Sequence, residues 1–314
     1  MNQRQLGNSG LRVGPLALGG NVFGWTADEA HSFEVLDAFV DSGLNLIDTA
    51  DVYSRWIPGH RGGESEAMIG KWLKSRGNRS RVVIATKVGI EMGPGEQGLS
   101  RPYIMRAVER SLERLGTDYI DLYQSHRDDP GTPMEETLGA YGDLIRQGKV
   151  RAIGASNFSA ERLMTALALA RSAQLPRYEC LQPCYNLYDR AGFEGELAEL
   201  CRREGVAVIS YFSLASGFLT GKYRSEKDLV NRARAYRVKD MMNERGFRIL
   251  HALDEIAREL GATPAQVSLA WLIARGVTAP IASATSAEQL REIVGATRLE
   301  LGAEAVRKLD QASS

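Results

Sequence analysis

The stretch Val82–Lys87 reads Val-Val-Ile-Ala-Thr-Lys, an apolar, largely β-branched run that ends in one charged residue. An amphipathic helical pattern follows at Arg101–Leu115, and a second apolar run follows at Ile120–Tyr123. Strand, helix and strand in this order form a βαβ unit, whose two strands lie parallel. Because both runs are apolar at successive rather than alternate positions, they indicate a parallel sheet that helices cover.

The same unit repeats along the chain. Runs of β type occur at Leu16–Gly19, Leu44–Ile47, Val82–Thr86, Ile120–Tyr123, Val150–Gly154, Leu181–Gln182, Val206–Tyr211 and Ala279–Ala282. The helical stretches are Asp28–Asp41, Ser65–Ser75, Arg101–Leu115, Pro133–Gln147, Ser159–Arg171, Phe193–Arg203 and Glu244–Leu260. About eight such units predict an α/β fold, a (β/α)8 TIM barrel that forms one domain over residues 1–314. A doubly wound sheet shares the βαβ unit and stays open on this pattern alone.

Turns and long loops add detail to this prediction. Two short extended runs between Arg4 and Leu18 flank the turn residues Gly7–Gly10, which predicts an N-terminal β-hairpin. The stretches Ser54–Glu64 and Ser213–Met242 exceed ordinary loop length. Loops of that length in a compact domain usually carry function.

The composition argues against several classes of partner. Lys and Arg number 39 and so do Asp and Glu, so the net charge is zero and favours neither a nucleic-acid nor a membrane partner. The longest apolar runs are strand-sized, and the first residues lack the apolar core of a signal peptide, so we expect a cytoplasmic protein. Cys180, Cys184 and Cys201 lack metal-ligand spacing, and no metal is predicted. The sequence does not indicate an oligomeric state.

Polar residues follow the predicted strands at their carboxyl ends, where the active sites of (β/α)8 barrels lie. In chain order they are Asp48, Tyr53, Lys87, His126, Ser156, Asn157, Gln182, Tyr211 and Ser283. A lysine at the rim of an apolar core needs a carboxylate, because an unpaired buried charge is costly. Asp48 ends the neighbouring strand and is the available partner. Taken alone, Lys87 and Asp48 could also form a purely structural ion pair.

Tyr53 and His126 favour a catalytic interpretation. A tyrosine beside a lysine can have its phenol pKa lowered, so that it serves as a general acid near neutral pH. A histidine at the same point can donate a hydrogen bond to a substrate carbonyl and polarise it. This set of groups suits carbonyl reduction, in which a cofactor must supply the hydride.

The chain resembles the aldo-keto reductases almost from end to end, in particular the bacterial branch similar to the voltage-gated potassium channel β-subunit. The matching segments are Asn45–Tyr53, Ala85–Lys87, Asp121–His126, Gly154–Phe158, Leu181–Leu187 and Ser213–Tyr223. The resemblance implies reduction of an aldehyde or ketone to the alcohol with NADP(H), with NAD(H) as the alternative cofactor. It assigns the catalytic roles to Asp48, Tyr53, Lys87 and His126, with Tyr53 as the general acid.

The resemblance also implies the cofactor contacts. Ser156, Asn157 and Gln182 would hold the nicotinamide carboxamide, and Tyr211 would stack on the ring. The loop across the pyrophosphate would use Ser213, Leu214, Gly217, Leu219, Gly221 and Lys222. The adenosine end would use Arg232, Ser283, Thr285 and Gln289.

The adenosine end departs from the family pattern. The segment 283–289 has no cation for a 2′-phosphate, and Glu292-Ile293 stands where the family often has Glu-Asn. We therefore expect Arg232 to meet the 2′-phosphate, because arginine is the preferred partner of phosphate. A solvated basic loop is the alternative.

The substrate is expected to be a small carbonyl compound, which the sequence does not identify further. Trp25 and Trp56 are predicted to line its pocket, with simple loop anchoring as the alternative for Trp56. Two classes of function remain open, a carbonyl reductase and a nicotinamide-nucleotide-sensing binding module with slow turnover.

Overall fold

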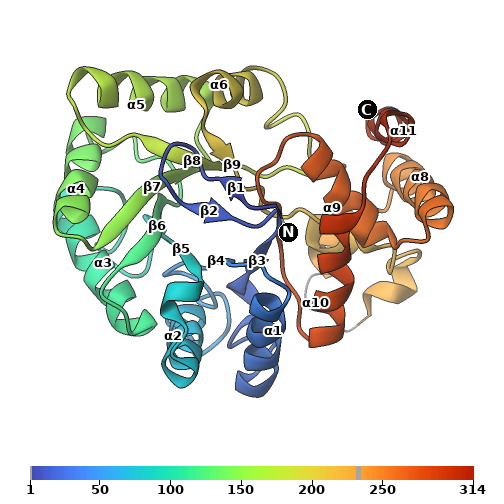
Figure 1. The fold of residues 1–314 in the computed structure, drawn as a ribbon, viewed down its shortest axis with the longest axis horizontal. Coiled ribbons are helices and arrows are strands. Elements are labelled where there is room, and N and C mark those ends of the chain that lie inside the picture. The colour runs from blue at the N-terminus through green and yellow to red at the C-terminus, as the bar shows by residue number, and fades with distance from the viewer. Residues whose placement is uncertain (1, 231–234) are drawn as a thin grey trace.

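Eight parallel strands form a curled sheet with helices around it in the computed structural model, which describes residues 2–230 and 235–314 (Figure 1). In sheet order the strands are β10 (Ile281–Ala282), β3 (Ala17–Gly19), β4 (Leu46–Asp48), β5 (Val83–Val88), β6 (Ile120–Ser125), β7 (Val150–Ser156), β8 (Tyr178–Gln182) and β9 (Ala207–Val208). Thr278 N donates to Val208 O (2.8 Å) and Ile281 N donates to Ser210 O (2.9 Å). These bonds join the chain at β9 to the chain at β10, so the sheet closes into the predicted (β/α)8 barrel.

The helices alternate with the strands as the sequence predicts. They are α1 (Glu29–Asp41), α2 (Glu64–Arg76), α3 (Arg101–Leu115), α4 (Met134–Arg146), α5 (Ala160–Ser172), α6 (Glu196–Glu204), α7 (Ala235–Lys239), α8 (Glu244–Leu260), α9 (Pro264–Ala274), α10 (Ala287–Val294) and α11 (Ala303–Ala312). Helices α3 and α8 begin and end at the predicted residues, whereas the ends of the other predicted elements shift. Among the described residues, no helix is both long and apolar enough to cross a membrane.

The predicted N-terminal hairpin is present and lies across one end of the barrel (Figure 1). Its strands β1 (Arg4–Gln5) and β2 (Arg12–Val13) pair antiparallel. Leu6 and Val13 are fully buried and pack into the barrel interior. The Arg4 guanidinium donates to Val277 O (2.8 Å), which precedes β10. The hairpin therefore covers the amino-terminal end of the strands.

The barrel interior is apolar toward the amino-terminal ends of the strands and polar at their carboxyl-terminal ends. Leu46, Ala85 and Leu122 belong to the inward-facing apolar cluster. Side chains on a strand point inward at every second residue, so the next inward positions are Asp48, Lys87 and Gln124. The register pairs Lys87 with Gln124, Gln124 with Gly154, and Ser156 with Gln182. This polar layer positions the candidate site.

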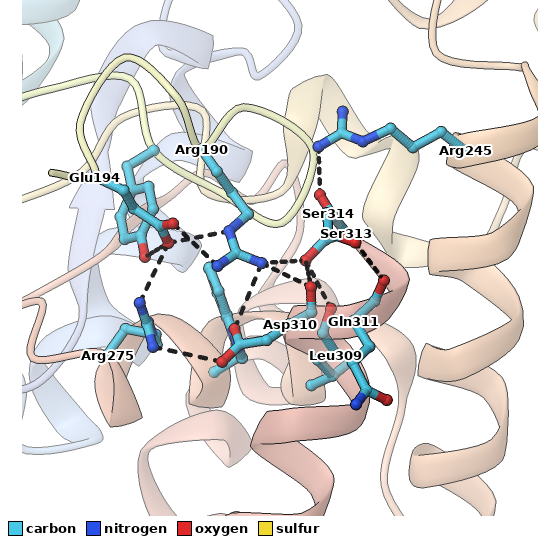
Figure 2. A network of polar contacts seen from close by, with 11 residues as sticks. Arg190, Glu194, Arg245, Arg275, Leu309, Asp310, Gln311, Ser313 and Ser314 are labelled. Atoms are coloured by element: carbon cyan, nitrogen blue, oxygen red, sulfur yellow. Dashed lines mark hydrogen bonds and ion pairs between the residues drawn. The ribbon is translucent and has the colours of Figure 1, made fainter.

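The last helix, α11, is held by a network of polar contacts (Figure 2). Asp310 accepts a hydrogen bond from Trp271 Nε1 of α9 (3.0 Å) and lies within 3.4–3.5 Å of the Arg275 and Arg190 guanidinium groups. Arg190 also pairs with Glu194 at 2.9 Å. The network ties α11 to α9 and to the segment that precedes α6.

Candidate active site

Lys87 lies at the centre of the polar layer. It is fully buried, and its Nζ donates to Asp48 Oδ2 (2.7 Å), to the carbonyl oxygen of Thr49 (2.7 Å) and to the phenol of Tyr53 (2.9 Å). An ammonium group has three N–H donors, so each of them has a partner here. The arrangement holds the charge of Lys87 directly against the Tyr53 oxygen.

Asp48 on β4 links Lys87 on β5 to Gln182 on β8. Its side chain is buried; Oδ2 meets Lys87 and, at 3.3 Å, the Tyr53 hydroxyl, whereas Oδ1 accepts from Gln182 Nε2 (2.8 Å). Both carboxylate oxygens are thus occupied. The carboxylate balances the lysine and also orients a residue that the sequence places at the nicotinamide.

The proton of the Tyr53 phenol is held more firmly than the sequence predicts. Burial, and then the neighbouring Asp48 carboxylate, raise the pKa of Tyr53 well above its usual value. The net shift of this pKa is thus opposite to the lowering expected from Lys87, since the buried phenol lies against the Asp48 anion as well as the Lys87 cation. Burial also lowers the pKa of Lys87, although its pairing with Asp48 opposes this. The Tyr53 phenol is therefore protonated at neutral pH.

His126 and Trp56 lie beside the Tyr53 ring, and Trp25 packs against Trp56. The His126 ring centroid lies 6.2 Å from that of Tyr53. Burial, and then Lys87, lower the pKa of His126 well below its usual value, so the imidazole is neutral at pH 7. Trp56 is 48% exposed and makes edge contacts with Trp25 (5.6 Å) and Tyr53 (6.0 Å). Both predicted pocket residues therefore lie on the Tyr53 side of the barrel mouth.

The residues expected at the nicotinamide form a connected group. Ser156 Oγ donates to the carbonyl of Gln182 (2.9 Å), and Asn157 Nδ2 donates to the carbonyl of His126 (2.9 Å). The Tyr211 hydroxyl donates to Asn157 Oδ1 (2.7 Å). Asn157 has a positive φ of 58°, which asparagine tolerates better than most residues. The fold thus brings together polar groups and an aromatic ring that fit a planar amide-bearing ligand.

The chain after β9 forms a tight loop with strained backbone. Ala215, Ser216 and Gly217 all have positive φ, at 47°, 57° and 95°. The N–H groups of Ala215 and Gly217 donate to the carbonyls of Phe212 (2.6 Å) and Leu214 (2.8 Å), so they hold the turn in this shape. A Cβ on Gly217 would lie 3.2 Å from the Lys222 ammonium, so the lysine lies against the loop. The Lys222 ammonium gives this loop a positive charge that suits the pyrophosphate of a dinucleotide.

Other residues expected in this loop stabilise its shape. Ser213 Oγ donates to the carbonyl of Ser210 (2.9 Å). The carbonyl of Leu214 accepts from Gly217 N (2.8 Å), and Leu219 is fully buried. Gly221 has a φ of 78°.

The adenosine end contains neutral donors from two neighbouring segments. Gln289 Oε1 accepts from both the backbone N (3.0 Å) and the Oγ1 (3.1 Å) of Thr285. Ser283 Oγ donates to Asn21 Oδ1 (2.7 Å), which follows β3. Arg232 lies outside the described residues.

Three contacts of this site are missed by the sequence analysis. Thr49 contributes a backbone carbonyl, which leaves no signature in a sequence. Asn21 follows the first barrel strand without a motif. Gln124 had a signal, since it is a polar residue two positions after the inward-facing Leu122. Its side chain is fully buried and contacts Gln182 and Asp48.

Comparison with known proteins agrees with this geometry. The Aldo/keto reductase family matches residues 15–314. An uncharacterized oxidoreductase of Bacillus subtilis is 37% identical, over 99% of this chain and 95% of that protein. An L-glyceraldehyde 3-phosphate reductase of Escherichia coli is 33% identical, over 99% and 92%. A "Putative voltage-gated potassium channel subunit beta" of Schizosaccharomyces pombe is 34% identical, over 98% and 92%. With the family matched over nearly its whole length, this chain belongs to the aldo/keto reductases and is an oxidoreductase.

Proposed function

We propose that the protein is a cytoplasmic enzyme that reduces a small aldehyde or ketone to the alcohol with NADPH. One observation carries this proposal: the buried Lys87 ammonium contacts both a carboxylate and the hydroxyl of a tyrosine that reaches the barrel mouth. A purely structural ion pair does not need a phenol as its third partner. A proton donor and a charge that stabilises its conjugate base are what carbonyl reduction requires.

The proposed chemistry assigns one task to each of the four residues. The bound cofactor supplies the hydride. The neutral imidazole of His126 donates a hydrogen bond to the carbonyl oxygen. Tyr53 gives its proton to the oxygen as negative charge develops there, and Lys87 stabilises the phenolate that remains. Asp48 balances the lysine and keeps it in place.

Ser156, Asn157 and Gln182 would hold the carboxamide of the cofactor, and Tyr211 would cover its ring. The strained loop at 215–217 and Lys222 would meet the pyrophosphate. Preference for NADPH over NADH would rest on Arg232, with Thr285 and Gln289 as neutral neighbours, because the segment 283–289 offers no cation.

Steady-state turnover on a panel of aldehydes and ketones, with NADPH and NADH in parallel, tests the proposal. The panel includes glyceraldehyde and glyceraldehyde 3-phosphate, since one relative is named as an L-glyceraldehyde 3-phosphate reductase. Consumption of NADPH that depends on the carbonyl compound, over many turnovers, supports the enzyme. Tight NADPH binding with almost no turnover would instead favour a nucleotide sensor, the alternative suggested by the relative named as a channel subunit.

A further inference from the structure

Gln124 is a buried amide in the polar layer that the proposed chemistry does not use. It lies on β6 at the register of Lys87 and is fully buried. A buried amide must find hydrogen-bond partners, since an unpaired polar group in the interior is costly. Its partners are both parts of the site described above, Gln182 and Asp48.

The contacts of Gln124 and Asp48 determine the orientation of the Gln182 amide. Gln182 Nε2 donates to Asp48 Oδ1 (2.8 Å) and to Gln124 Oε1 (3.3 Å). An amide nitrogen has two hydrogens, so both donors of Gln182 are used. Gln124 Nε2 also approaches Asp48 Oδ1, at 3.5 Å. The oxygen of Gln182 is therefore the atom left to accept a hydrogen bond from a ligand.

The neighbouring strand leaves room for Gln124. Gly154 is its partner in the register on β7. A Cβ at position 154 would lie 3.0 Å from Cγ and 3.3 Å from Oε1 of Gln124, closer than ordinary van der Waals contact. The absence of a side chain at Gly154 thus gives Gln124 the space for its observed position.

We infer that Gln124 is a positioning residue that locks the Gln182 amide with its oxygen free, so that the site selects a nicotinamide ring bearing a carboxamide N–H donor. This inference rests on the proposed function, because it assumes that Gln182 meets the nicotinamide. Its specific consequence is that removal of Gln124 weakens recognition of the carboxamide and spares the rest of the nucleotide.

The test compares two ligands and four proteins. The ligands are NADP⁺ and its 3-acetylpyridine analogue, which has a carbonyl but no N–H donor at that position. The proteins are the wild type, Gln124→Met, Gln124→Glu and the control Gln147→Met, an exposed residue at the end of α4. Affinities come from fluorescence titration, after circular dichroism has established that each variant is folded.

We expect the wild type to bind NADP⁺ more tightly than the analogue. In Gln124→Met, NADP⁺ affinity should fall about three- to tenfold, as for one lost neutral hydrogen bond, while the analogue is bound as before. Burial beside the Asp48 carboxylate should keep the Gln124→Glu side chain protonated. It then retains an acceptor for the Gln182 amide and a donor for Asp48, so the ratio of the two affinities should return toward the wild-type value. Gln147→Met should match the wild type.

Unchanged NADP⁺ affinity in Gln124→Met, or an equal loss for both ligands, would overturn the inference and leave the proposed function standing. If Gln124→Met does not fold, the Gln124→Glu variant decides. Equal affinities of Gln124→Glu for NADP⁺ and for the analogue would then overturn the inference. If the wild type binds neither ligand, the proposed function fails as well.

Discussion

Two lysine–carboxylate pairs in this molecule have nearly equal lengths and opposite surroundings. Lys87 and Asp48 are 2.7 Å apart with both side chains almost wholly buried, whereas Lys71 and Glu29 are 2.6 Å apart with more than half of each side chain exposed. At the scale of single residues, burial decides what each pair contributes. An exposed pair adds little to stability, but a buried carboxylate that loses its cation is strongly destabilising.

Lys87→Met should therefore abolish carbonyl reduction and lower the free energy of unfolding by about 3–5 kcal/mol. Lys71→Met, the same substitution at the surface, should cost less than about 1 kcal/mol and leave turnover unchanged. Denaturant unfolding and steady-state kinetics on both variants check this. Equal losses of stability in the two variants, or a Lys87→Met enzyme with normal turnover and pH profile, would be incompatible with the assigned role.

The contribution of Asp51 to stability should depend on pH, and this dependence also arises from burial. It is 2% exposed, and neither carboxylate oxygen has a hydrogen-bond partner. Burial, and then the charge of Glu66, raise the pKa of Asp51 well above its usual value, while Arg114 and Lys87 oppose the shift. In the folded state the group therefore keeps its proton to higher pH than in the unfolded chain, where it ionises at about pH 3.9. Its contribution to stability is therefore complete at low pH and is lost as the pH rises.

Asp51→Asn removes this titration. Between the pKa of Asp51 in the unfolded chain and its pKa in the folded protein, the wild type loses up to about 1.4 kcal/mol of unfolding free energy for each rise of one pH unit. The variant should thus gain stability relative to the wild type as the pH rises above about 4, as measured by denaturant unfolding at several pH values. A difference in unfolding free energy that does not change with pH would show that Asp51 is ionised in the fold.

At this scale the sequence predicts a residue's role from its position along a strand. Lys87, Asp48 and Gln182 could be placed because charged and polar residues at strand ends converge in a barrel. The raised pKa of Tyr53 could not, because it depends first on burial of the phenol and then on the 3.3 Å approach of the Asp48 carboxylate. Gln124 is missed although it had a signal, because it lies within β6 and before the strand end at which polar residues were sought.

At the scale of elements, α11 is held by polar contacts as well as by apolar burial. Its fully buried apolar side chain is Leu309, and Asp310 provides the link to Trp271, Arg190 and Arg275 (Figure 2). Asp310→Ala leaves the Trp271 N–H without an acceptor and should cost about 1–3 kcal/mol. Amide hydrogen exchange should rise in α11 first.

Gln311→Ala, on the exposed side of the same helix, is the matched control and should leave α11 exchange almost unchanged. Mass-spectrometric hydrogen exchange and thermal unfolding measure both variants. If α11 exchanges at the same rate in Asp310→Ala as in Gln311→Ala, the network does not hold the helix.

Sequence patterns locate a helix most accurately when it has an apolar stripe beside a polar face. Helices α3 and α8 have a clear apolar stripe and were predicted to the residue. Helix α9 is apolar on nearly all sides because it is buried between its neighbours, with Val267, Leu269, Trp271 and Leu272 all inaccessible. It has no stripe to detect. Helix α7 has five residues, and so short a pattern is hard to distinguish from a loop. Helices α10 and α11 are about as long as α6, which the sequence predicts, and each has a polar face, so the sequence contained a signal for them.

At the scale of the whole molecule, the two ends of the barrel have different tasks. The hairpin β1–β2 covers the amino-terminal end, and the polar layer lies at the carboxyl-terminal end, as is general for this fold. Substitutions in the site should therefore change chemistry while the barrel stays closed. This separation makes the central claim, proton donation by Tyr53, accessible to a single substitution.

The most direct test is turnover of Tyr53→Phe on the best carbonyl substrate, measured beside its affinity for NADPH. Loss of a general acid should lower kcat by about 10²–10⁴-fold. NADPH affinity should stay within about twofold of the wild type, because the phenol proton is needed only in the transition state. A folded Tyr53→Phe enzyme that keeps more than about a tenth of wild-type turnover would contradict the account.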